Sequence, residues 1–118
     1  MTGPIPGDDA IRVRIYFGER DHHGHNALWS AMLQFLRREG CAGATVTRGV
    51  AGFGAHSVIH AASIVDLSTD LPMVLEWIDT EPMVNRLLPQ LGSMLDGGMI
   101  TTEPVTIVAY RTHDGARD

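Results

Sequence analysis

Most histidines of this chain lie in two short groups, and imidazole is a common protein ligand of divalent metals. His56 and His60 stand four residues apart, so on a helix they would share a face and could hold a zinc ion. The second group follows Asp21 and comprises His22, His23 and His25. Because neither group has an acidic or cysteine ligand at a characteristic spacing, solvated segments remain the alternative. We assign no metal site and keep His56 and His60 as candidates.

The triplet Gly52-Phe53-Gly54 is the other local feature that could bind a ligand. Glycine has no Cβ, so backbone N–H groups can approach an anion closely there. The triplet lies in segment 51–70, which sustains neither a helical nor a strand period and is long for a strand-to-strand connection. A β-bulge remains the alternative. The triplet is neither a dinucleotide fingerprint nor a P-loop, because its spacing differs and the chain has no lysine.

The composition excludes several kinds of chemistry. All nine basic residues are arginine, which excludes Schiff-base lysine chemistry. A net charge of −5 without a basic cluster disfavours nucleic acid as a partner. Cys41 is the single cysteine, so no disulfide can form within the chain, and no G-x-S-x-G nucleophile motif occurs. We expect no enzymatic activity and no required cofactor.

The chain of 118 residues is long enough for one domain, which we expect over residues 11–111. Residues 1–10 are predicted to be a disordered leader and residues 112–118 a polar tail. The leader lacks the basic start and apolar core of a signal peptide. No apolar run approaches the roughly 20 residues of a membrane-spanning helix. We therefore expect a cytoplasmic protein.

The periodicity predicts six elements that would position these residues. Strict alternation from Ile11 to Phe17 predicts a first strand, and apolar residues at helical spacing after Asn26, a plausible N-cap, predict a helix that ends near Gly40. Further strands are expected over 44–50, 71–79 and 99–111. A second helix should start at Asp79 or Thr80, with Pro89 causing a kink or an early break.

The order strand, helix, strand, strand, helix, strand predicts an α+β fold. Right-handed crossovers in both halves give a ferredoxin-like βαββαβ sandwich, a four-stranded antiparallel sheet with two helices on one face. The open face would carry Arg12 and Arg14, and Glu76 could pair with either of them. Tyr110, Val108 and Ile78 would make this face partly apolar, which suits burial against another subunit.

Two stretches of the chain resemble a known family. Residues 43–54, Gly-Ala-Thr-Val-Thr-Arg-Gly-Val-Ala-Gly-Phe-Gly, resemble the second strand and loop start of PII signalling proteins. Residues 96–100, Asp-Gly-Gly-Met-Ile, are similar to the PII B-loop with a glycine inserted and without its lysine. The chain is also similar to a PII-like bacterial family, domain of unknown function 190. Ile15-Tyr16-Phe17-Gly18-Glu19 and Asp70-Leu71-Pro72 carry that second resemblance.

The resemblance implies a regulatory homotrimer that binds a small anionic metabolite, an adenine nucleotide being one candidate, in clefts between subunits. Segment 51–70 would be the counterpart of the PII signalling loop and would contact a partner protein. Family members are often encoded beside fluoride exporters, which makes a membrane transporter one candidate partner. The implied ligand-binding residues are Thr45, Thr47, Arg48, Gly52, Phe53, Gly54, Gly97, Gly98 and Arg111, with Arg48 and Arg111 standing in for the missing lysine.

Two other functions stay open on this fold. One is a metal-binding trimer of the CutA type that uses the histidine groups. The other is a small cofactor-free enzyme on a ferredoxin-like dimer, a fold that hosts several unrelated functions.

Overall fold

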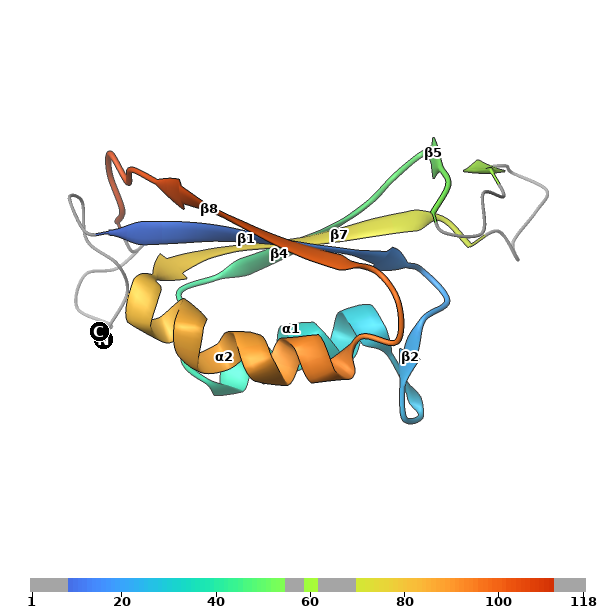
Figure 1. Ribbon diagram of the computed structural model, residues 1–118, viewed down its shortest axis with the longest axis horizontal. Helices are drawn as coiled ribbons and strands as arrows, with labels where there is room; N and C mark the ends of the chain where they lie inside the picture. The colour runs from blue at the N-terminus through green and yellow to red at the C-terminus, as the bar shows by residue number, and fades with distance from the viewer. Residues whose placement is uncertain (1–8, 55–58, 62–69, 112–118) are drawn as a thin grey trace.

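Four strands form one antiparallel sheet in the order β4-β7-β1-β8, seen in a computed structural model that describes residues 9–54, 59–61 and 70–111. The strands are β1 (Ala10–Gly18), β4 (Ala44–Arg48), β7 (Pro72–Thr80) and β8 (Met99–Val105). Helices α1 (Leu28–Arg38) and α2 (Glu81–Met94) lie together on one face of this sheet (Figure 1). The predicted ferredoxin-like arrangement is confirmed.

Alternation along the strands directs one set of side chains into the core. Val13, Ile15 and Leu75 are fully buried, and Trp77 is 1% exposed. The apolar stripes of the two helices close over them. The helices contribute Leu28, Met32, Leu36, Val84, Leu87 and Leu91 to the core, and the sheet adds Phe17 and Met73. The fold is therefore fixed by a single hydrophobic layer between the sheet and the helices.

The end of α1 and the start of α2 follow the sequence prediction. After α1, Gly40 has a φ of 84°, and the N–H groups of Gly40 and Cys41 donate to the carbonyls of Arg37 and Leu36. Thr80 caps α2 by accepting from the N–H of Met83 at 3.4 Å. Of the kink or early break expected at Pro89, the early break is wrong, because the helix continues to Met94. Pro89 and Asn85, four residues earlier, are both exposed, so water can bond the Asn85 carbonyl that the proline leaves unpaired.

The expected N-cap at Asn26 is also wrong. Asn26 pairs with His23 in a short hairpin of strands β2 (His22–His23) and β3 (Asn26–Ala27), and the N-cap residue is Ala27. Gly24 turns the hairpin with a φ of 63°, a conformation that glycine adopts without strain. The Leu28 N–H donates to the Asp21 carbonyl at 2.8 Å, so the hairpin rather than a side chain starts the helix.

Two strands are shorter than expected. The strand predicted over 44–50 ends at Arg48. The Gly49 N–H still donates to the Pro72 carbonyl at 2.7 Å, but Pro72 has no N–H to return the bond, so the ladder stops there. A separate pair follows, β5 (Ala51–Gly52) with β6 (His60–Ala61), inside the segment expected to lack structure. The strand predicted over 99–111 ends at Val105, which pairs with the first residue of β1, and the described residues offer no strand partner beyond it. Tyr110 and Val108 therefore do not extend the open face.

The face opposite the helices carries paired charges in its centre. Arg14 Nε lies 2.9 Å from Glu76 Oε1, which confirms the expected pairing, and Arg12 Nη2 lies 2.6 Å from Glu103 Oε1. The pKa of Arg14 is raised, chiefly by its hydrogen bond to Glu76. The pKa of Glu103 is lowered, chiefly by its hydrogen bond from Arg12.

The expected leader, apart from Asp9 and Ala10, and the expected tail lie outside the described residues. Within the described part of the chain, neither helix has the length and apolarity needed to cross a membrane.

Candidate functional site

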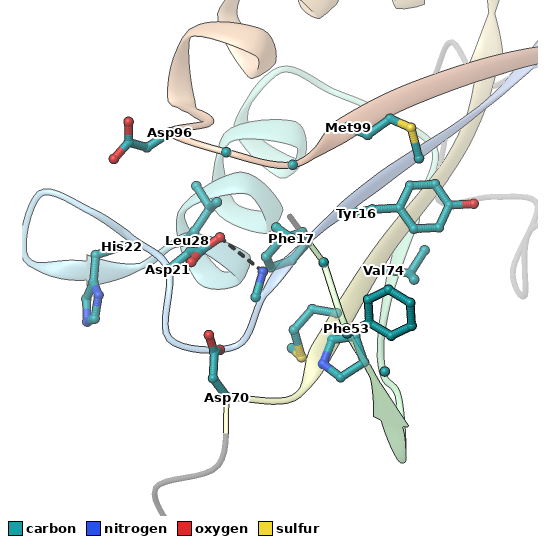
Figure 2. Close-up of a pocket in the computed structure, with 17 residues that line it drawn as sticks. Tyr16, Phe17, Asp21, His22, Leu28, Phe53, Asp70, Val74, Asp96 and Met99 are labelled. Carbon is teal, nitrogen blue, oxygen red and sulfur yellow. Dashed lines mark hydrogen bonds between the residues drawn. The ribbon is translucent and has the colours of Figure 1, made fainter. Parts of the chain in front are cut away.

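A groove of about 960 Å³ opens at one end of the sheet, within the usual size range of ligand pockets. Its walls come from the end of β1, Asp21 and His22 at the start of the β2–β3 hairpin, Leu28 of α1, the residues at and after β5, Asp70 with the start of β7, and the turn before β8. Figure 2 shows Phe17 in the middle of these walls, with Tyr16, Val74, Phe53 and Met99 to one side. The groove therefore lies where segment 51–70 leaves and rejoins the sheet.

The turn at Gly97 and Gly98 forms one rim of the groove. Gly98 has a φ of 116°, and a Cβ built there would overlap the carbonyl oxygen of Tyr16. Nothing lies within 4 Å of a Cβ built at Gly97. The second glycine is thus required by the close passage of the turn over β1, independently of any ligand.

The glycine triplet forms the opposite rim. A Cβ at Gly52 would lie 3.0 Å from Cγ of Pro72, so this glycine lets β5 pack against the start of β7. Phe53 is 68% exposed although its ring lines the groove. Gly54 also lines the groove, with nothing within 4 Å of the position its Cβ would take. In this triplet, Gly52 is needed for packing. Phe53 presents an exposed aromatic ring, and the backbone of Gly54 is uncrowded.

Glu19 bonds to residues that flank both ends of segment 51–70. Its backbone N–H donates to the Leu71 carbonyl at 2.9 Å, and its carboxylate accepts from Arg48 Nη1 at 2.9 Å. Asp70, the last residue of the segment, adds a further bond, because its Oδ1 accepts from the Arg20 N–H at 2.8 Å. The two ends of the segment are therefore held together beside the groove.

Two carboxylates converge on Gly18. Asp21 Oδ2 accepts from the Gly18 N–H at 3.0 Å, the bond drawn in Figure 2. A Cβ built on Gly18 would lie 3.0 Å from Asp70 Oδ1 and 3.3 Å from Asp21 Oδ1. Asp96 adds a third carboxylate to the groove. Sequence reasoning missed these acids as site residues, although Gly18 and Asp70 both lie in the motifs that carried the family resemblance.

The structure brings together five of the predicted ligand-binding residues at this groove: Gly52, Phe53, Gly54, Gly97 and Gly98. Thr45 and Thr47 lie on the open face of β4, opposite Glu76 and Val74, and do not line the groove. Arg48 is 60% exposed in its ion pair with Glu19. Arg111 belongs to the segment that follows β8, whose last residue pairs with Ala10 at the far end of β1 (Figure 1).

The metal candidates are not tested by this geometry. His56 lies outside the described residues, and for His60 the structure gives the backbone pairing with Gly52. Among the described residues, no group of three or more histidine, cysteine, aspartate or glutamate side chains could hold a metal ion. His22, His23 and His25 belong to the exposed β2–β3 hairpin.

Cys41 lies away from the groove, after α1. Burial raises its pKa to about 11, and the nearby Asp79 carboxylate acts in the same direction. Asp79 itself is 1% exposed and accepts hydrogen bonds from Trp77 Nε1 and the Thr80 N–H. The thiol is therefore protonated at neutral pH, which makes it a poor nucleophile.

Comparison with known proteins identifies the family. The profile of DUF190, described as Uncharacterized ACR, matches residues 10–107. The chain belongs to this family. A UPF0166 protein of Methanocaldococcus jannaschii is 35% identical over 103 residues, covering 86% of this chain and 94% of the relative. A UPF0166 protein of Aquifex aeolicus is 30% identical over 96 residues, covering 81% of this chain and 90% of the relative.

Two solved structures share the fold of this DUF190 chain. One is described as a PII-like signalling protein of Thermus thermophilus, with a TM-score of 0.61 and 20% identity over 86% of this chain and 91% of that one. The other is CPII of Thiomonas intermedia, bound to ADP and bicarbonate. Its TM-score is 0.52 and its identity 16%, over 84% of this chain and 88% of that one. The chain therefore has a PII-like fold.

Proposed function

We propose that this chain is a PII-like regulatory protein without catalytic activity. In this proposal it binds a small anionic metabolite, an adenine nucleotide being the first candidate, and reports the bound state through segment 51–70. The observation that supports it most directly is the groove between the Gly97–Gly98 turn and the Gly52–Gly54 triplet. A ligand there would contact the sheet and the first and last residues of segment 51–70 at the same time.

The ligand candidate is supported by a structural relative. CPII shares the fold and is bound to ADP and bicarbonate. A planar base could rest on the exposed ring of Phe53, since aromatic rings stack on one another with favourable energy. Thr45, Thr47, Arg48 and Arg111 remain proposed ligand contacts. Arg48 would have to leave Glu19 to reach a phosphate, and Arg111 would have to come from another subunit.

A homotrimer is the proposed assembly, with the groove completed by a neighbouring subunit. The open sheet face supports it, because its charges are paired with one another while Tyr16, Val74 and Ile78 are only half-buried in the single chain. Such a face can be covered by another subunit without leaving an unpaired charge.

Segment 51–70 is the proposed contact with a partner protein, for which a membrane transporter is one candidate. Its described part and the residue before it expose large apolar side chains: Val50 is 78%, Phe53 68% and Ile59 72% exposed. Clustered exposed apolar residues are typical of protein contacts. The protein is proposed to work in the cytoplasm.

Isothermal titration with ADP and ATP tests this function. We expect saturable binding, and ligand at about 100 times Kd should stabilise the protein by about 2.7 kcal/mol. Phe53→Ala should weaken binding about tenfold, because stacking on one base is worth about 1–3 kcal/mol. Val50→Ala is the matched control, since Val50 is similarly exposed but does not line the groove.

Light scattering tests the assembly in the same samples. The expected mass is about three times the 12.8 kDa of one chain. A monomer, or the absence of binding by any adenine nucleotide, would contradict the proposal.

A further inference from the structure

An ion pair connects the residues that flank segment 51–70. Arg48, the last residue of β4, has its Nη1 2.9 Å from Glu19 Oε2. Glu19 follows Gly18, the last residue of β1, and its backbone N–H donates to the Leu71 carbonyl at 2.9 Å. The ion pair and this hydrogen bond together connect the chain just before the segment with the chain just after it.

The ion pair lies next to the groove. Neither Arg48 nor Glu19 is among the described residues that line the groove, but their neighbours are. Arg48 lies opposite Met73 in the register of β4 and β7, and Met73 lies opposite Phe17 in the register of β7 and β1. Met73, Phe17 and Gly18 all line the groove. Because directly paired residues have Cβ atoms about 4.5–5.5 Å apart, the Arg48 side chain starts one strand away from the groove lining.

The ion pair is exposed enough to exchange partners. The side chains of Arg48 and Glu19 are 60% and 28% exposed. Ion pairs at such exposed positions correspond to a preference of less than about fivefold for the paired state. A phosphate group can accept two parallel N–H bonds from one guanidinium, which is a stronger contact than a single bond to a carboxylate oxygen. An anionic ligand in the groove can therefore take Arg48 from Glu19.

We infer that Glu19 competes with the anionic ligand for the guanidinium of Arg48. This inference rests on the proposed function and names a residue that sets the affinity of that site for phosphate. A phosphate that binds Arg48 breaks one of the contacts between the two flanks of segment 51–70. By linkage, the ion pair weakens ligand binding by the same factor by which the ligand weakens the ion pair. Glu19 is thus a positioning residue, which acts on the ligand through Arg48.

Titration of the full-length protein with ADP tests this competition. Glu19→Gln removes the competing charge and keeps the backbone N–H that donates to Leu71. We expect ADP to bind about two- to fivefold more tightly to this variant, the range set by the strength of an exposed ion pair. Adenosine has no phosphate to accept the Arg48 guanidinium, so its affinity should be the same in both proteins.

Glu39→Gln is the matched control. Glu39 Oε1 lies 2.9 Å from Arg86 Nη1, and these side chains are 33% and 54% exposed. The variant therefore removes an equivalent ion pair and the same charge. Neither Glu39 nor Arg86 is among the described residues that line the groove, so the affinity for ADP should not change.

The Arg48→Gln background separates competition from simple repulsion. A carboxylate near a phosphate repels it whether or not Arg48 is present, whereas competition requires the guanidinium. Arg48→Gln alone should weaken ADP binding, because the phosphate loses its contact. Adding Glu19→Gln to Arg48→Gln should then produce no further change, since the two residues act as a coupled pair.

The outcomes separate this inference from the proposed function. The inference is wrong if Glu19→Gln does not tighten ADP binding, if adenosine shares the gain, or if the gain is equal in the Arg48→Gln background. In each of these cases ADP still binds and the regulatory function stands. If neither the wild-type protein nor any variant binds ADP, the adenine nucleotide is wrong as the ligand, and the inference fails with it.

Discussion

The two faces of the sheet are made by alternate residues of the same strands, yet they have opposite chemistry. On β7, Leu75 is fully buried under the helices, while its neighbours Val74 and Glu76 are half-buried on the open face. The covered face is uniformly apolar apart from Asp79. The open face combines paired charges in its centre with a groove at one end.

This difference separates stability from binding within a single sheet. The covered face excludes water and contributes most of the hydrophobic free energy of folding. The open face contributes less to the free energy of folding, so its residues are less constrained by stability and can serve binding. A change on the covered face should therefore act on folding, and a change on the open face should act on assembly or ligand affinity.

The sharpest test compares adjacent residues of β7. Leu75→Ala should lower the free energy of unfolding by about 2–5 kcal/mol, because it leaves a cavity in a closed core. Val74→Ala removes a side chain from the open face and should cost less than about 1 kcal/mol in a dissociated chain. Urea unfolding followed by circular dichroism measures both.

Protein concentration distinguishes the faces further. The loss in Leu75→Ala should not depend on concentration, whereas any added loss in Val74→Ala should, since it would act through association. Equal, concentration-independent losses would contradict the assignment of the two faces.

A second test compares the adjacent glycines at the groove. Gly98→Ala should destabilise the protein by about 1–3 kcal/mol, because alanine is strained at a φ of 116° and its Cβ would overlap the Tyr16 carbonyl. Gly97→Ala should have little effect, since open space surrounds that position. Thermal unfolding measures the difference in Tm between the two variants.

The stability and the ADP affinity of the two glycine variants together test the position of the turn. If Gly98→Ala is as stable as Gly97→Ala, the turn does not pass over β1 as closely as described, and the rim of the groove would have to be redrawn. Measuring ADP affinity on both variants shows whether the rim also positions the ligand.

The sequence was sufficient for the parts of the fold that depend on local periodicity. Alternation in β1 correctly predicted which residues enter the core, and it placed Arg12 and Arg14 on the open face as the two candidate partners of Glu76, of which the structure shows Arg14. Local signals failed where tertiary contacts decide. Asn26 has an N-cap side chain but pairs in a hairpin. Strand β4 ends early beside Pro72, which lies 23 residues further along the chain and has no N–H to continue the ladder.

The groove was predictable only in part, for the same reason. The glycines were found through the family resemblance, which implies a role for Gly52, Gly54, Gly97 and Gly98. No local sequence pattern identifies the three carboxylates of the groove, because Asp21, Asp70 and Asp96 come from three distant positions and meet only in the folded chain. Arg48 was expected to face a ligand, but its partner in this structure is Glu19.

The smallest effect concerns the paired charges of the open face. The hydrogen bond from Arg12 lowers the pKa of Glu103 below its ordinary value of 4.5. A lowered carboxyl pKa stabilises the folded state above the unfolded pKa, and this stabilisation is lost as pH falls through the folded pKa. Stability should therefore decrease as pH falls below about 4.5, and Arg12→Gln should reduce that part of the decrease.

Arg37→Gln, which removes a similar charge from the last turn of α1, is the control that should leave this decrease unchanged. Urea midpoints measured across this pH range for the three proteins test the pair, and identical pH profiles in all of them would mean that the Arg12–Glu103 contact does not influence folding in solution.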